Sequence, residues 1–312
     1  MIASIFNKSK PFNYLLIGLF LSAFYVLYSF KVIPAGNYHL VLKQTGIFLA
    51  LAGSLFIANF ITRKNGLSKD NTYTMLFFLL FLVLFPTIFK NSSVVISNLF
   101  VLFALRRLIS LQSLVSPKEK IFDASFWIFV ASVFHFWSIL YILLVFVSII
   151  FHVSRDYRNW IIPFIAFFAV ATIYSVYALA TGIDIINHFK QGATISFDFT
   201  YFENIYQNIA LAAFSSIMVL LVASQITALP AKPLNMHSSY KKVIFSFFIG
   251  VAVYVLSTEK NNSFLAFTFA PLAIMGANYL ESQKINWIKE SVLIIITTVS
   301  IALFFLNYSL LP

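Results

Sequence analysis

The chain has 312 residues and a formal net charge of +11, and 61% of its residues are hydrophobic while only 10% are charged. A soluble protein of this length could not cover its surface with so few charges, so the composition excludes a soluble globular protein. The absence of cysteine excludes disulfides, thiolate metal sites and thiol nucleophiles. The excess positive charge lies in short loops beside apolar segments. We therefore read it as a signal of membrane topology and expect no nucleic-acid partner.

Eleven apolar segments follow one another along the chain, and we predict that each is a membrane helix. They cover residues 12–30, 40–62, 73–89, 92–111, 121–134, 137–152, 159–179, 205–228, 243–257, 263–281 and 290–309. The first segment lacks a small-residue cleavage site, so we expect it to be retained as a helix. The block 121–152 is too long for one helix, and we predict two short helices that turn near His135. The expected fold is an all-α bundle that forms one transmembrane domain over residues 1–312.

The basic residues fall in every second gap between these segments. If the N-terminus is cytoplasmic, 16 of the 21 basic residues lie on the cytoplasmic side. These sixteen are Lys8, Lys10, Arg63, Lys64, Lys69, Arg106, Arg107, Lys118, Lys120, Arg155, Arg158, Lys232, Lys241, Lys242, Lys284 and Lys289. This is the positive-inside pattern of a multi-pass protein of the bacterial inner (cytoplasmic) membrane. With eleven spans, the C-terminus is expected outside.

The outer side offers few acidic residues that could take part in catalysis. The longest outer loop, residues 180–204, contains Asp184, Asp198 and Glu203, and a tight outer turn contains Glu259. A carboxylate at these positions could act as a general base, which makes the four residues the candidate catalytic groups. The alternative is that the loop is a solvated connector with aromatic interface anchors and the turn a solvated hairpin. Within the loop, residues 182–189 are expected to form a short amphipathic helix at the membrane interface.

Two lysines on the outer side are candidates for binding the phosphate of a lipid. Lys260 follows Glu259 in the tight outer turn, and Lys43 lies near the outer end of the segment 40–62. A lysine offers a point charge to a phosphate, although the favoured interpretation of Lys43 is that its ammonium group extends to the interface without a ligand. Asp123 is expected at the start of a helix, where the helix dipole favours a carboxylate. The histidines form no HxxxH or HxH pair, and we expect no metal and no cofactor.

Two stretches resemble the membrane glycosyltransferases of the GT-C superfamily, which take sugars from polyprenyl-phosphate carriers. The first is residues 123–151, beginning Asp-Ala-Ser-Phe-Trp, with the basic turn 155–160 after it. The second runs from the outer turn Asn261-Asn262-Ser263 through Pro271 to Glu281. The two stretches cover about a fifth of the chain. These enzymes typically carry an acidic residue in the first outer loop, whereas residues 31–39 contain neither Asp nor Glu. The whole chain also resembles uncharacterised multi-pass proteins of Bacteroidota.

The resemblance implies a protein of envelope glycan assembly that transfers a sugar from a polyprenyl-phosphate carrier at the outer face. The missing acid in the first outer loop favours a second hypothesis, a non-catalytic membrane subunit that scaffolds a partner protein or binds lipid. A transporter of small molecules or lipids is the third hypothesis. It is disfavoured because the spans carry almost no ionisable residue of the kind that coupled carriers use.

Overall fold

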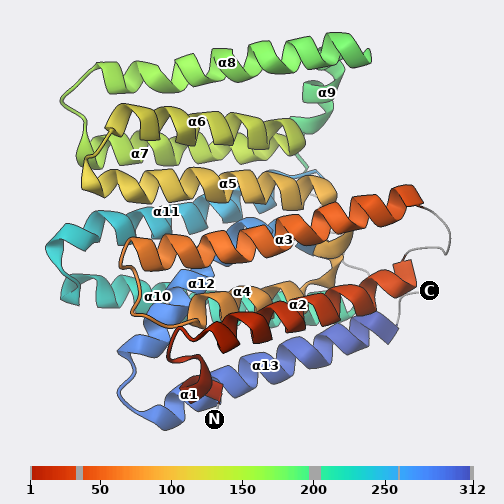
Figure 1. The fold of residues 1–312 in the computed structure, drawn as a ribbon, viewed down its shortest axis with the longest axis vertical. Coiled ribbons are helices and arrows are strands. Elements are labelled where there is room, and N and C mark those ends of the chain that lie inside the picture. The colour runs from red at the N-terminus through yellow and green to blue at the C-terminus, as the bar shows by residue number, and fades with distance from the viewer. Residues whose placement is uncertain (1, 33–37, 197–204, 259–260, 310–312) are drawn as a thin grey trace.

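A computed structural model of the chain describes residues 2–32, 38–196, 205–258 and 261–309, and within these ranges every regular element is a helix. Figure 1 shows the long helices lying side by side, with α8 at one edge of the bundle and α13 at the other. The α-helices are α1 (Ile2–Phe6), α2 (Pro11–Val32), α3 (Tyr38–Lys64), α4 (Tyr73–Leu84), α5 (Ser92–Ser110), α6 (Pro117–Phe134), α7 (Ile142–His152), α8 (Arg158–Thr181), α9 (Ile185–Gly192), α10 (Ile205–Ala228), α11 (Leu234–Leu256), α12 (Ala266–Ser282) and α13 (Asn286–Ser309). Five short 3-10 turns join or extend them: η1 (Pro86–Lys90), η2 (Leu111–Ser113), η3 (Phe136–Tyr141), η4 (Leu229–Ala231) and η5 (Asn262–Leu265).

Eight of the helices in the described ranges are long and apolar enough to cross a membrane. They confirm a multi-pass membrane protein, because the apolar side chains of such helices are more stable in the hydrocarbon of a bilayer than in water. Two further apolar helices, Tyr73–Leu84 and Phe136–His152, are shorter. A helix also covers the segment 121–134, but it carries four charged residues among its first seven positions, 117–123. The count of eleven spans therefore stays a prediction.

The block 121–152 does contain two helices. α6 ends at Phe134, and η3 and α7 run back beside it in the opposite direction (Figure 1). The turn lies at His135, whose extended backbone ends the helix. The expectation for Asp123 is wrong, because α6 begins six residues earlier at Pro117, a residue that suits the first position of a helix. Asp123 instead pairs with Arg107 of α5 at 2.7 Å.

The centre of the bundle is filled by aromatic rings. All twelve residues of α4 are buried, and α4 packs on α12, which is almost entirely buried as well. The rings of Phe81, Phe85, Phe214 and Phe269 contact one another at centroid distances of 5.1–6.0 Å. Edge-to-face contacts of this kind add to the dispersion energy of the packed interior.

The two ends of the bundle differ in charge. The last turns of α3 and α5 and the first turns of α6 and α8 meet at one end, the left in Figure 1. These turns and the loops beside them carry Arg63, Lys64, Arg106, Arg107, Lys118, Lys120, Arg155 and Arg158. We call this end the basic end. The opposite end carries α9 and the beginning of α3 (Figure 1). Each end has a cavity, and the candidate sites lie there.

Candidate functional site

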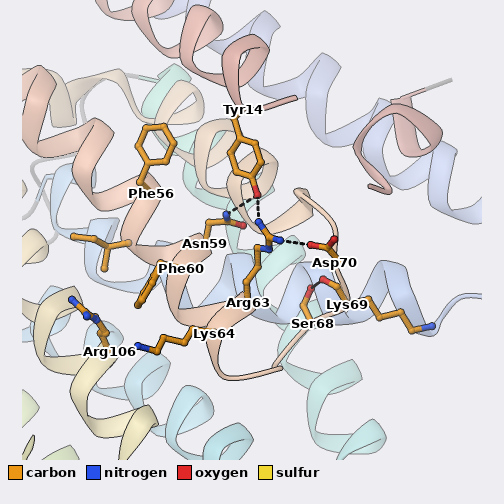
Figure 2. A pocket seen from close by; sticks show the side chains of 11 residues that line it. Tyr14, Phe56, Asn59, Phe60, Arg63, Lys64, Ser68, Lys69, Asp70 and Arg106 are labelled. Atoms are coloured by element: carbon orange, nitrogen blue, oxygen red, sulfur yellow. Dashed lines mark hydrogen bonds and ion pairs between the residues drawn. The ribbon is translucent and has the colours of Figure 1, made fainter. Parts of the chain in front are cut away.

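A pocket of about 810 Å³ opens at the basic end, between α2, the last turns of α3, the loop that follows α3, and α5. Figure 2 shows the side chains that line it. They are Tyr14, Phe56, Ile57, Asn59, Phe60, Arg63, Lys64, Ser68, Lys69, Asp70 and Arg106. We call this the basic pocket.

The sequence of α3 gives the pocket its mixed character. Phe56, Asn59, Phe60, Arg63 and Lys64 follow at intervals of three, four, seven and eight residues, so they share one face of the helix. The apolar members lie farther from the helix end, and the charged members occupy its last turn. Cations are favoured at the C-terminal end of a helix, where backbone carbonyls lack helical partners. One face of α3 is therefore apolar near the middle of the helix and positively charged at the C-terminal end.

A chain of polar contacts crosses the pocket. The guanidinium of Arg63 donates to the hydroxyl of Tyr14 at 2.6 Å and pairs with the carboxylate of Asp70 at 2.5 Å. Asn59 donates to the same hydroxyl at 3.4 Å (Figure 2). Asn59 is only 5% exposed, and its Oδ1 is buried without a hydrogen-bond partner among the described residues. This buried acceptor without a partner costs free energy, and its burial closes it to a ligand in the pocket.

Two cations share one aromatic ring at the other side of the pocket. The ammonium group of Lys64 lies 5.2 Å from the ring centroid of Phe60, and the guanidinium of Arg106 lies 4.7 Å from the same centroid. Both side chains lie beside Phe60 in Figure 2. Neither forms a salt bridge with a carboxylate in the described part of the chain. The ring attracts each cation, but the two cations repel each other.

A carboxylate on α12 holds the loop that closes the pocket. Oε1 of Glu281 accepts hydrogen bonds from the hydroxyl of Ser68 at 2.7 Å, from the backbone N–H of Lys69 at 2.9 Å and from the side-chain amide of Asn71. A second contact ties the loop to the N-terminus, since the backbone N–H of Thr72 donates to the carbonyl of Phe6 at 3.1 Å. These bonds fix the backbone that places Lys69 and Asp70 in the pocket.

The positive potential extends beyond the pocket lining. Lys120, in the first turn of α6, has a lowered pKa because it is partly buried and because Arg107 and Lys64 lie near it. Its ammonium group donates to the carbonyl of Ser110 at 2.8 Å. A lysine whose charged form is disfavoured by its neighbours indicates a region with an excess of positive charge.

The candidate residues from the sequence belong to the opposite end, and the structure describes two of the six. Asp184 caps α9, since its Oδ1 accepts from the backbone N–H groups of Ile186 at 3.0 Å and Asn187 at 3.2 Å. Its Oδ2 accepts from the side chain of Asn187 at 2.6 Å. Lys43 is an exposed residue of α3. Asp198, Glu203, Glu259 and Lys260 lie outside the described residues, so the proposed catalytic and phosphate-binding roles stay predictions.

The cavity at this end has a volume of about 710 Å³ and lies beside α9, so we call it the α9 cavity. Its lining residues are Ser132, Val133, Phe134, His135, Phe136, His188, Phe189, Gln191, Gly192, Thr194, Ser196, Thr258 and Phe264. α9 confirms the short helix expected near residues 182–189, with its start three residues later. The cavity combines aromatic rings with uncharged polar groups.

His135 is the most constrained polar group of the α9 cavity. Burial lowers its pKa to about 4, so the imidazole is neutral at pH 7. Its Nε2 lies 3.1 Å from the hydroxyl of Ser257, which itself donates to the carbonyl of Val253 at 2.7 Å. Nε2 therefore donates to Ser257, and Nδ1 is left as an acceptor. The ring also packs on Phe264 at a centroid distance of 4.8 Å.

The basic pocket was missed by the sequence analysis, which read its cations only as a topology signal. One signal was available, because Phe56, Asn59, Phe60, Arg63 and Lys64 share a helix face. The contribution of Arg106 had no such signal, since it comes from α5 and meets Phe60 only through tertiary packing. The support from Glu281 joins residues more than 200 positions apart in the chain.

The apolar helices and the charged basic end define a polytopic helical membrane protein with an amphipathic pocket at one end. The chain belongs to a family described as a family of unknown function, DUF6427, whose match covers residues 1–311. No curated protein matches the chain, and no solved structure matches it.

Proposed function

We propose that this membrane protein binds the phosphorylated headgroup of a lipid in the basic pocket. The observation that carries the proposal is the placement of Lys64 and Arg106 beside one ring, with no salt bridge to either cation among the described residues. Their combined positive charge attracts an anion, and phosphate is an anion that arginine and lysine recognise.

A lipid fits the pocket better than a soluble anion does. Phe56 is 50% exposed and Phe60 is 39% exposed, and both line the pocket on the side toward the middle of α3. In water such exposed rings would be unfavourable, but a hydrocarbon chain would cover them. α3 is itself one of the helices apolar enough to span a membrane, so its exposed face would contact lipid in the bilayer. The headgroup would lie at Lys64 and Arg106, and the chain would follow α3.

The positive-inside rule places the basic end in the cytoplasm, so the lipid would come from the cytoplasmic leaflet of the inner membrane. With the eleven predicted spans, this orientation also puts the C-terminus outside. A single cysteine tests it cleanly, because the chain contains none. Val115→Cys at the basic end and Ile195→Cys at the other end replace exposed residues. We expect a membrane-impermeant thiol reagent to label only the second variant in intact spheroplasts, and the reverse result would contradict the orientation.

Binding can be measured on the full chain in detergent by native mass spectrometry with added dioleoyl phosphatidic acid. We expect Lys64→Gln and Arg106→Gln each to weaken binding about tenfold, since each removes a charge-assisted contact. The matched control is Lys241→Gln, because Lys241 also lies at the basic end above an aromatic ring, 5.9 Å from that of Phe151, but outside the pocket. Equal losses in all three variants would show a general charge effect and would refute the site.

A second candidate function is sugar transfer from a polyprenyl-phosphate carrier at the opposite end. The α9 cavity favours it, because Ser196 and Thr258 line the cavity and stand directly before the segments that contain Asp198, Glu203, Glu259 and Lys260. In this hypothesis one of the four outer acids is the general base, and Lys260 with Lys43 holds the phosphate.

Asp184 gives this second hypothesis a sharp test. Asn caps a helix about as well as Asp does, whereas Ala costs about 1 kcal/mol at that position. Asp184→Asn therefore keeps α9 in place while it removes a general base, and Asp184→Ala removes both functions. The test compares the envelope glycans of cells that carry only Asp184→Asn, Asp198→Asn, Glu203→Gln or Glu259→Gln. If all four strains match the wild type, the sugar-transfer hypothesis is refuted.

A further inference from the structure

The charges of the basic pocket are far from balanced. Its lining contains four cations and one carboxylate, which leaves a net charge of +3. Asp70 is already paired with Arg63. The three other cations, Lys64, Lys69 and Arg106, form no salt bridge within the part of the chain that the structure describes. A ligand with a single negative charge would leave two of them uncompensated.

The two cations on Phe60 are close enough to act on one headgroup. Their distances to the ring centroid place the two cationic centres no more than about 10 Å apart. This is comparable with the distance of roughly 8 Å over which physiological salt screens charges. A phosphomonoester carries about −1.5 to −2 charges at pH 7. A diphosphate carries more and is longer, so it can contact both cations at once.

A neutral group of the pocket is compatible with the same class of ligand. The hydroxyl of Tyr14 accepts from both Arg63 and Asn59, and no described residue accepts its proton. A phosphate oxygen of the ligand can accept that proton.

We propose that the basic pocket selects lipids whose headgroup ends in a phosphomonoester or a diphosphate over phosphodiester lipids. This inference rests on the proposed binding of a phosphorylated lipid and adds the class of headgroup. Lys64 and Arg106 supply the charge that distinguishes the two classes.

The test compares four probes at constant ionic strength on the full chain in detergent: farnesyl diphosphate, dioleoyl phosphatidic acid, dioleoyl phosphatidylglycerol and inorganic diphosphate. We expect the first two to bind at least tenfold more tightly than phosphatidylglycerol. Lys64→Gln and Arg106→Gln should reduce this preference to less than threefold. Lys241→Gln should leave the preference unchanged.

The outcomes separate this inference from the proposal on which it rests. If phosphatidylglycerol binds as tightly as phosphatidic acid, and both depend on Lys64 and Arg106, the headgroup selection is refuted while lipid binding stands. If no lipid responds to Lys64→Gln or Arg106→Gln more than to Lys241→Gln, both are refuted. If inorganic diphosphate binds as tightly as farnesyl diphosphate, the ligand is a soluble phosphate and the assignment to a lipid is overturned.

Discussion

Glu281 is expected to control the basic pocket although it does not line it. One carboxylate oxygen, Oε1, accepts three hydrogen bonds from the loop that carries Lys69 and Asp70. A hydrogen bond to a charged group contributes about 1.5–3 kcal/mol when buried and less when partly exposed, as Glu281 is. With about 1 kcal/mol for each bond, Glu281→Ala should destabilise the closed loop by about 3 kcal/mol. Asn71 adds to this loss because it is only 3% exposed and would keep an unpaired donor.

The variant Glu281→Gln tests the size of the energy assigned to these hydrogen bonds. Its amide oxygen can accept the same three bonds, but neutral hydrogen bonds are about half as strong, so the loss should be about 1.5 kcal/mol. Amide hydrogen exchange measures these losses directly, since the backbone N–H of Lys69 is one of the donors. We expect exchange in residues 67–73 to accelerate roughly 100-fold in Glu281→Ala and roughly tenfold in Glu281→Gln. Lipid binding in the basic pocket should weaken in the same order.

Glu119→Ala is a suitable control, because Glu119 is an exposed acid in the first turn of α6 and makes no contact with this loop. Exchange in residues 67–73 should not change in that variant. The reasoning is refuted if Glu281→Ala exchanges within threefold of the wild type, or if Glu281→Gln is the more damaging of the two replacements.

Two further predictions concern the core and the turn at His135. Gly276→Ala should destabilise the protein by about 1–2 kcal/mol in thermal unfolding, because its Cβ would lie 2.8 Å from the fully buried ring of Phe77 and overpacking outweighs the gain in helix propensity. Gly46→Ala, where a Cβ meets nothing within 4 Å, should be neutral or slightly stabilising, and equal effects would contradict the packing argument. The pKa of His135 is about 4 in the folded state and 6.5 in the unfolded state. The free energy of unfolding should therefore be constant above pH 6.5. It should decline by up to about 1 kcal/mol per pH unit as the pH falls from 6.5 to 4. His135→Gln should flatten this decline and His39→Gln, at an exposed site, should not, so an unchanged pH profile in His135→Gln would refute the assignment.

The positions of the membrane helices could be predicted because the hydropathy of a segment depends only on the residues within it. Each apolar segment coincides with a helix, and even the turn at His135 follows from the length of the block 121–152. Polar residues were harder to interpret, because the same side chain serves different purposes in different surroundings. Asp184 stands before an amphipathic stretch and caps a helix, a role that its place in the sequence permitted but that the search for a general base obscured.

The basic pocket could not be assembled from the sequence for a different reason. Its geometry depends on Arg106 reaching Phe60 across two helices and on Glu281 holding a loop from another part of the chain. Such contacts are set by packing at long sequence separation, which no local pattern encodes. What the sequence did contain was the charge excess, which the sequence analysis interpreted only as a signal of topology.

A final prediction distinguishes a functional charge cluster from an ordinary basic membrane face. Two cations no more than about 10 Å apart repel each other by at least about 0.4 kcal/mol in a water-like medium and by at least about 1.7 kcal/mol at an effective dielectric constant of 20. Lys64→Gln relieves this repulsion but loses a contact with the ring of Phe60, worth about 0.5–1 kcal/mol. Lys241→Gln loses a similar contact with the ring of Phe151, on which no second cation lies among the described residues. The difference between the two variants therefore isolates the repulsion.

Without lipid, Lys64→Gln should be more stable than Lys241→Gln by about 0.5–1.5 kcal/mol at low ionic strength, measured by thermal unfolding in a neutral detergent. The difference should nearly vanish in 1 M salt, where charges are screened beyond about 3 Å. With phosphatidic acid the order should reverse, because the lipid stabilises the variant with the intact pocket through mass action. If the basic residues only orient the protein in the membrane, added lipid should leave the order of stability of the two variants unchanged. The same order with and without lipid would therefore count against a binding pocket.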